Sequence, residues 1–162
     1  MLNADFLTSK GRGMENNSWI CSDEAATAVL ATRLAGKAEK GDVFALFGTL
    51  GMGKSVFARA FIKALCSVSE VPSPTFTLVQ EYSAPKFTVF HYDLYRLKSP
   101  EEIFELGMEE AMYGGVCLIE WPERMGEYLP RKCINITIEP VAEGRKITLD
   151  SSDKLRLERL LG

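Results

Sequence analysis

The chain has very little histidine and no closely spaced cysteines, and these absences exclude several kinds of site. Its only histidine is His91, and its four cysteines form no CxxC pair; they are Cys21, Cys66, Cys117 and Cys133. Structural zinc sites draw their ligands from such residues at short spacings, so none is expected. Because the cysteines have apolar neighbours, we expect buried, reduced thiols of the kind common inside cells.

Membrane and export signals are also missing from the sequence. The longest apolar runs, such as residues 116–119, are far shorter than the ~20 residues that a membrane-spanning helix needs. Residues 1–13 lack the apolar stretch of a secretory signal peptide. We therefore expect a cytoplasmic protein that does not contact a membrane.

There is no excess of positive charge. Lys and Arg number 19 against 22 Asp and Glu, which gives a net charge of −3 and an isoelectric point near 5.3. Proteins that hold nucleic acid on their own surface usually present a basic face. The charge balance argues against direct RNA binding and leaves open a contact made through partner proteins.

The length and composition that remain fit one globular domain. The 162 residues are 46% hydrophobic and 25% charged, close to the averages for soluble domains. Residues 1–18 mix Gly, Asn, Ser and Lys without apolar periodicity, so they are predicted to form a flexible N-terminal extension, in which Met14 is an alternative start. Residues 19–162 are predicted to form a single domain.

Alternating strand and helix patterns predict an α/β fold. A first helix is expected to be capped by Ser22 and to end at Gly41. The patterns then predict a buried strand over 43–47, a helix from about Gly53, strands over 75–82 and 87–92, a helix over 99–106, a buried strand over 116–119, a hairpin of 133–139 with 146–150, and a helix over 155–161. This order favours a sandwich with a mostly parallel central sheet, an antiparallel rim and helices on both faces.

The turn after the strand 43–47 has the sequence GTLGMGKS and matches the phosphate-loop pattern GxxxxGK[ST] at every defined position. Small residues let successive backbone N–H groups converge on phosphate oxygens, and the following helix adds its positive N-terminus. Lys54 is expected to be an exposed ligand of the phosphates, and Ser55 a ligand of magnesium. The sequence thus predicts a P-loop NTPase-like fold with ATP and Mg²⁺ as cofactors, bound by Gly48, Thr49, Leu50, Gly51, Met52, Gly53, Lys54 and Ser55.

Hydrolysis also needs acidic side chains, and two follow predicted strands. Asp93 comes directly after the strand 87–92, and Glu120 directly after the strand 116–119. In an open α/β sheet, ligands bind at the carboxyl ends of the strands, so both acids could reach a bound metal. With Lys54 they are the candidate catalytic residues, and with Ser55 the candidate metal ligands. His91 and Trp121 lie next to these acids in the sequence. For both residues, a role at the site and simple packing in the core remain alternative interpretations.

Four sequence blocks together resemble the TsaE (YjeE) family, P-loop ATPases of bacterial tRNA threonylcarbamoyladenosine biosynthesis. The blocks are FGTLGMGKS at 47–55, SPTFTLVQEY at 73–82, HYDLYRL at 91–97 and LIEWPER at 118–124. The resemblance implies that Ser55 and Glu120 bind magnesium and that Asp93 is the Walker B-like acid near the metal and water.

The resemblance implies further roles at the nucleotide. Thr75 is expected in a switch-like segment that senses the γ-phosphate. The start of the first helix, around Asp23 and Glu24, is implied on the side of the nucleotide base. So are Gly144 and Arg145, which are expected at the turn of the hairpin.

The resemblance also implies partners, which are the TsaD carbamoyltransferase and its companion TsaB. ATP turnover would reset or regulate that complex, and tRNA would be met only through it. Two other interpretations remain. A small-molecule kinase would need an acceptor pocket and usually an arginine-rich lid, whereas the arginines here are scattered. A nucleotide-dependent adaptor would need no turnover; the NKxD segment of guanine-specific switches is absent, so ATP is preferred.

Overall fold

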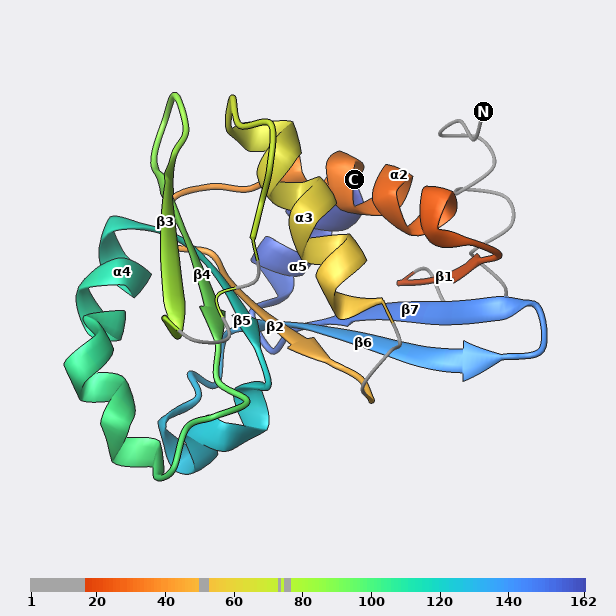
Figure 1. The fold of residues 1–162 in the computed structure, drawn as a ribbon. Helices are drawn as coiled ribbons and strands as arrows, with labels where there is room; N and C mark the ends of the chain where they lie inside the picture. The colour runs from red at the N-terminus through yellow and green to blue at the C-terminus, as the bar shows by residue number, and fades with distance from the viewer. Residues whose placement is uncertain (1–16, 50–52, 73, 75–76) are drawn as a thin grey trace.

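A seven-stranded sheet organises the part of the chain that the computed structural model describes, which is residues 17–49, 53–72, 74 and 77–162 (Figure 1). The strand order is β1-β7-β6-β2-β5-β4-β3. β2 pairs in parallel with β5 and β6, and β5 in parallel with β4, while β1, β7 and β3 pair antiparallel at the two edges. The predicted parallel centre with an antiparallel rim is confirmed. The strands are β1 Ser18–Cys21, β2 Val43–Phe47, β3 Val79–Ser83, β4 Thr88–Asp93, β5 Gly115–Glu120, β6 Ile134–Val141 and β7 Gly144–Asp150.

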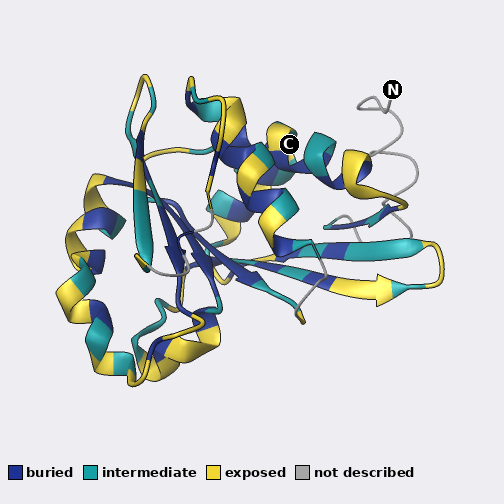
Figure 2. Cartoon of the chain, viewed as in Figure 1, coloured by how far each residue is buried: buried dark blue, intermediate teal, exposed yellow. Residues whose placement is uncertain are grey.

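Helices cover both faces of this sheet because its central strands are apolar on both sides. On β2, Phe44 and Leu46 face one core, and Val43 and Ala45 face the other. The first core is covered by α2 (Glu24–Ala35), α3 (Lys54–Leu65) and α5 (Lys154–Leu161), and the second by η1 (Pro100–Leu106), α4 (Met108–Gly114) and η2 (Pro122–Tyr128). Figure 2 shows the central strands as the most deeply buried elements.

Both predicted ends of the first helix are wrong. α2 is capped by Asp23, whose Oδ1 accepts the Ala26 N–H at 2.8 Å, and it ends at Ala35 with Gly36 as C-cap. Gly41 instead lies in the turn that enters β2, with φ of 97°, and its N–H donates to the Gly115 carbonyl at 2.8 Å. The later glycine therefore serves the strand and not the helix.

Three short elements were not predicted: β1, α4 and η2. The terminal hairpin is longer than expected, and its turn is formed by residues 142–143. β3 begins at Val79, later than the predicted start at 75; residues 75 and 76 lie outside the described ranges. None of the helices in the described ranges has the length and apolar character needed to span a bilayer.

The four cysteines are free thiols, and all are buried, as predicted. Cys21 and Cys66 belong to the core beneath α2 and α3, whereas Cys117 and Cys133 belong to the core beneath η1 and α4. Burial raises the pKa of the Cys21 thiol to about 11 and that of the Cys117 thiol to about 12. Both thiols are therefore protonated, and unreactive, near neutral pH.

Candidate nucleotide site

The phosphate-loop pattern lies where β2 ends and α3 begins. Gly48 and Gly53 have φ of 154° and 95°, values that residues with a side chain rarely adopt. A Cβ atom at Gly48 would lie 2.8 Å from the Ile138 carbonyl oxygen, and one at Gly53 would lie 3.1 Å from a guanidinium nitrogen of Arg145. Both positions therefore require glycine. Thr49, another predicted phosphate ligand of the turn, is exposed. The predicted ligands Leu50, Gly51 and Met52 lie outside the described residues.

Lys54 begins α3, and the structure corrects the expectation that it is exposed. Its residue is only 5% exposed, and its Nζ lies 3.6 Å from the centroid of the Trp121 ring. Among the described residues, Nζ has no hydrogen-bond partner. Desolvation lowers the pKa of Lys54, against the opposing influence of Glu120, Glu123 and Asp93. A buried cation at a helix N-terminus that lacks an acceptor is a group that an anionic ligand would satisfy.

Asp93 and Glu120 meet at the end of the sheet where the glycine turn lies. They are the last residues of β4 and β5 and are paired in the register of the two parallel strands. Glu120 is also in register with Leu46 of β2, one residue before the strand ends. Both acids are buried, at 7% and 5% exposure, and Asp93 Oδ1 accepts the Tyr95 N–H at 3.0 Å. The side chains that the sequence singled out thus gather beside Lys54.

His91 provides a contact that the sequence left open. Its Nε2 lies 2.6 Å from Oε2 of Glu120, and the histidine is only 2% exposed. No partner for Nδ1 occurs among the described residues, so we assign the proton to Nε2, which donates to the carboxylate. The bond fixes the orientation of the Glu120 side chain. His91 and Asp93 are two residues apart on one strand, so their side chains lie on the same face of the sheet. This spacing was the sequence signal that could have placed His91 at the site.

Trp121 directly follows Glu120 and has an unusual backbone. Its φ and ψ are 59° and 49°, in the left-handed region, which costs a residue other than glycine about 1–2 kcal/mol. The ring packs against Tyr95 at a tilt of 53°, with centroids 5.0 Å apart, and covers Lys54. Strained residues of this kind cluster at functional sites. The simpler expectation was that Trp121 only packs in the core. Its contact with the Lys54 ammonium instead places it at the candidate site.

Two of the residues assigned to the nucleotide-base side, Gly144 and Arg145, lie where β7 meets the chain just before α2 and the phosphate turn. Gly144 begins β7 with φ of 139°, and a side chain there would collide with the backbone of Cys21 and Ser22 just before α2. Arg145 pairs with Cys21 and reaches Gly53 of the phosphate turn, so it connects the hairpin to the site. Glu24 is exposed in the first turn of α2. Gly144 and Arg145 follow the hairpin turn and do not form it, and Thr75 lies outside the described residues.

The residues present fit a magnesium-bound nucleotide. Within the described ranges there is no group of three or more His, Cys, Asp and Glu side chains that could hold a metal on their own. Mg²⁺ is usually bound by one or two carboxylates together with substrate phosphates and water. The Ser55 hydroxyl, which is exposed, and the carboxylates of Asp93 and Glu120 are oxygen donors of that kind. The ammonium group of Lys54 is a positive charge of the kind that binds phosphate.

Comparison with known proteins gives consistent relatives. A family model described as "Threonylcarbamoyl adenosine biosynthesis protein TsaE" matches residues 21–147, which include the phosphate turn, Asp93 and Glu120. The chain is 44% identical over 129 residues to the tRNA threonylcarbamoyladenosine biosynthesis protein TsaE of Rickettsia felis, covering 79% of this chain and 75% of the relative. It is 36% identical over 137 residues to the protein of the same name from Bacillus subtilis, covering 83% and 85%. The crystal structure of Bacillus subtilis YdiB matches with a TM-score of 0.72 at 29% identity, covering 88% of this chain and 92% of that chain.

Proposed function

The chain belongs to the TsaE family, and from this premise we propose that it binds and hydrolyses ATP as a subunit of the machinery that makes tRNA N6-threonylcarbamoyladenosine. The observation that carries the proposal is the buried Nζ of Lys54, which has no hydrogen-bond partner among the described residues and begins a helix directly after a glycine turn. Such a group is unfavourable until it meets negative charge.

The proposed roles follow from the chemistry of each group. The turn 48–53 and the N-terminus of α3 bind the phosphates through backbone N–H groups, and Lys54 pairs with their charge. Ser55, Asp93 and Glu120 hold the magnesium ion. When bound, Mg²⁺ supplies neutralisation of the phosphate charge. Asp93, the Walker B-like acid, would also orient the attacking water.

The remaining roles concern the edges of the site and the proteins around it. Glu24, Gly144 and Arg145 are proposed to face the nucleotide base, and Thr75 the γ-phosphate. We propose residues 19–162 as the ATPase domain and residues 1–18 as an extension. The partners are the TsaD and TsaB proteins, whose complex the ATPase resets or regulates in the cytoplasm, and tRNA is reached only through them.

Replacing Lys54 by methionine tests the nucleotide site. Lys54→Met removes the charge but keeps an unbranched side chain against Trp121, so ATP affinity should fall about 10- to 100-fold, the range for losing a hydrogen bond to a charged group. The melting temperature should not fall, because the buried ammonium lacks a hydrogen bond to lose. Lys63→Met, an exposed position on the same helix, is the matched control.

Isothermal titration with ATP and Mg²⁺ gives the affinities, and phosphate release gives the turnover. Unchanged ATP affinity in Lys54→Met would remove the assignment of this turn as a phosphate site. Phosphate release without any second small substrate separates an ATPase from a small-molecule kinase, and release that requires an acceptor would support the kinase.

A further inference from the structure

η1, α4 and η2 lie on the side of the sheet away from α2 and α3, and each has exposed residues along its length (Figure 2). Phe104 on η1 is 60% exposed and Tyr113 on α4 is 80% exposed, two of the four exposed large hydrophobic side chains among the described residues. Tyr128 of η2 packs edge-on against Phe104, with ring centroids 5.0 Å apart. Exposed aromatic clusters of this kind are enriched at protein–protein interfaces.

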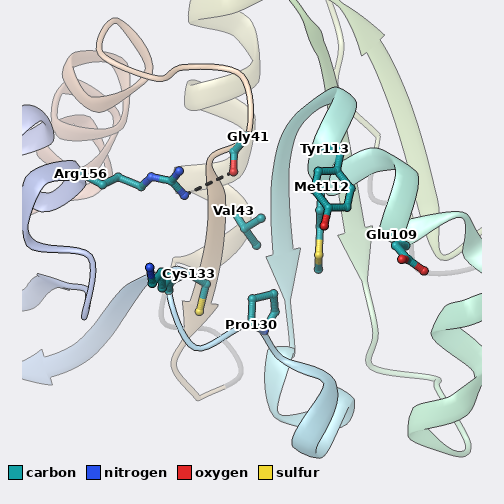
Figure 3. A pocket seen from close by; sticks show the side chains of 9 residues that line it. Gly41, Val43, Glu109, Met112, Tyr113, Pro130, Cys133 and Arg156 are labelled. Atoms are coloured by element: carbon teal, nitrogen blue, oxygen red, sulfur yellow. Dashed lines mark hydrogen bonds between the residues drawn. The ribbon is translucent and has the colours of Figure 1, made fainter.

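Two hollows lie on either side of α4. A groove of about 150 Å³ runs between Phe104, Met112 and Tyr128. A cavity of about 290 Å³ lies between Tyr113 and Met112 of α4 and the starts of β2 and β6 (Figure 3). Glu109 and Met112 of α4 line both the groove and the cavity, so the two hollows adjoin the same helix. We call Phe104, Glu109, Met112, Tyr113 and Tyr128 the α4 surface.

The chain segment that forms η1 and α4 has charged side chains of one sign only, whereas η2, which contributes Tyr128, also contains Arg124. Residues 99–114 contain no lysine or arginine and five glutamates, which are Glu101, Glu102, Glu105, Glu109 and Glu110. The far wall of the cavity contains two cations, Arg156 and Lys132. The Arg156 guanidinium is paired with Asp42 at 3.2 Å, so Lys132 is the positive charge that this wall adds beside the five glutamates. Nucleic acid phosphates would be repelled by the glutamates, whereas lysine and arginine side chains would complement them.

The α4 surface is joined to the nucleotide site through a single short element. η2 is preceded by its N-cap Trp121, which covers Lys54, and ends at Tyr128, which lines the groove. The Tyr128 hydroxyl also donates to Glu101 of η1 at 3.3 Å. A molecule seated in the groove would therefore contact η2, the element that directly follows Trp121, whose ring covers Lys54.

We propose that the α4 surface binds a partner protein through a segment with an apolar side chain in the groove and lysine or arginine side chains beside the glutamates. The inference rests on the proposed function, since it assigns the surface by which the partner complex reaches the nucleotide site. Binding hot spots are usually aromatic or arginine anchors near the centre of an interface, and the rim around them is polar.

The first experiment measures binding of the TsaD–TsaB complex by biolayer interferometry. Phe104→Ser and Tyr113→Ser should each weaken binding by about 10-fold or more, the level typical of hot-spot residues. Leu155→Ser is the matched control, because Leu155 is equally exposed at 80% but lies on α5. The double charge reversal Glu109→Lys with Glu110→Lys should slow association at low salt, whereas Glu158→Lys on α5 should not.

Each outcome bears on one proposal. If the parent chain binds the complex and both serine variants bind equally well, the α4 surface is not the docking site, while the proposed function stands. ATP affinity of the isolated variants should match the parent, because none of these residues belongs to the nucleotide site. If the parent does not bind the complex at all, the proposed partnership fails, and a second probe decides the surface.

That probe is a synthetic helical peptide with leucines on one face and lysines on the other, titrated into the isotopically labelled protein. Its NMR shift changes should concentrate in η1, α4 and η2, and Phe104→Ser should remove them. A second peptide with the leucines replaced by serine keeps the charge and should bind more weakly. Shift changes elsewhere, none at all, or equal binding of the two peptides would overturn the proposal.

Discussion

Glu120 connects two buried groups that have few other partners. Its carboxylate accepts from His91 at 2.6 Å and contributes the largest favourable charge interaction to Lys54. A buried carboxylate needs such partners, because desolvation of an unpaired charge costs several kcal/mol. Glu120 thus links His91, by a hydrogen bond, and Lys54, by charge, into one connected set of side chains.

Neutralising the acids should change the metal requirement of the reaction. We expect Asp93→Asn and Glu120→Gln each to lower ATP turnover, and at least one to raise the magnesium concentration for half-maximal rate by about 10- to 100-fold, as is typical when metal-site groups are altered. Glu123→Gln is the control, since Glu123 also acts on Lys54 but is exposed on η2. Magnesium titrations that overlay the parent for both acids would reduce them to structural residues.

The sequence allowed the prediction of the acids but not of the contacts between the side chains. Asp93 and Glu120 follow from a simple rule, because the carboxyl ends of parallel strands share one edge of a sheet. The His91–Glu120 bond joins residues 29 positions apart, and the cover of Trp121 over Lys54 depends on a left-handed backbone at the tryptophan. Neither feature has a local sequence signature.

At the scale of elements, strong local patterns were enough and weak ones were not. The apolar run of β2 was predicted correctly, as was the start of α3 next to Gly53. β1 was missed because its four residues are held by pairing with β7, more than a hundred positions along the chain, from Ser18 with Thr148 to Cys21 with Arg145. The cap of α2 was misplaced by one residue, since serine and aspartate are both good caps and adjacent here. The hydrogen bond from the Ala26 N–H to Oδ1 of Asp23 identifies aspartate as the cap.

The helix cap can be tested directly by two alanine variants. Asp23→Ala removes the acceptor for the Ala26 N–H and should lower the free energy of unfolding by about 1 kcal/mol. Ser22→Ala, one residue earlier and also exposed, should change it by less than about 0.5 kcal/mol. Urea denaturation of both variants measures the difference. A larger loss for Ser22→Ala would restore the cap that the sequence predicted.

Across the whole molecule, each of the two cores contains buried thiols, and their ionisation makes the stability of the fold depend on pH. The folded protein keeps Cys117 protonated, with a pKa of about 12 against an ordinary value of 9.0. Above about pH 9 the unfolded chain therefore loses a thiol proton that the folded chain retains, and stability should fall as the pH rises toward 12. The free energy of unfolding of Cys117→Ala should fall less steeply over this range, whatever its starting value. An identical slope in parent and variant would contradict the assignment.

The charge and architecture of the whole molecule lead to a final prediction, that ATP turnover depends on partners. The described residues form a single sheet with the candidate nucleotide site at one end. The net charge of the chain is −3, which does not favour binding of tRNA without a partner. We therefore expect slow hydrolysis by the isolated chain and a changed rate once the TsaD–TsaB complex is added.

Because coupling between binding sites is reciprocal, the complex should shift ATP affinity by the same factor by which ATP shifts affinity for the complex. Phosphate release and nucleotide affinity are measured for the chain alone, with the complex, and with the complex and tRNA. Lys54→Met is the control, measured at an ATP concentration that fills the parent site but leaves the weakened site of the variant mostly empty. An effect of tRNA only in the presence of the complex would agree with indirect contact. Rapid turnover by the chain alone, indifferent to both additions, would describe a free-standing ATPase and remove the proposed partnership.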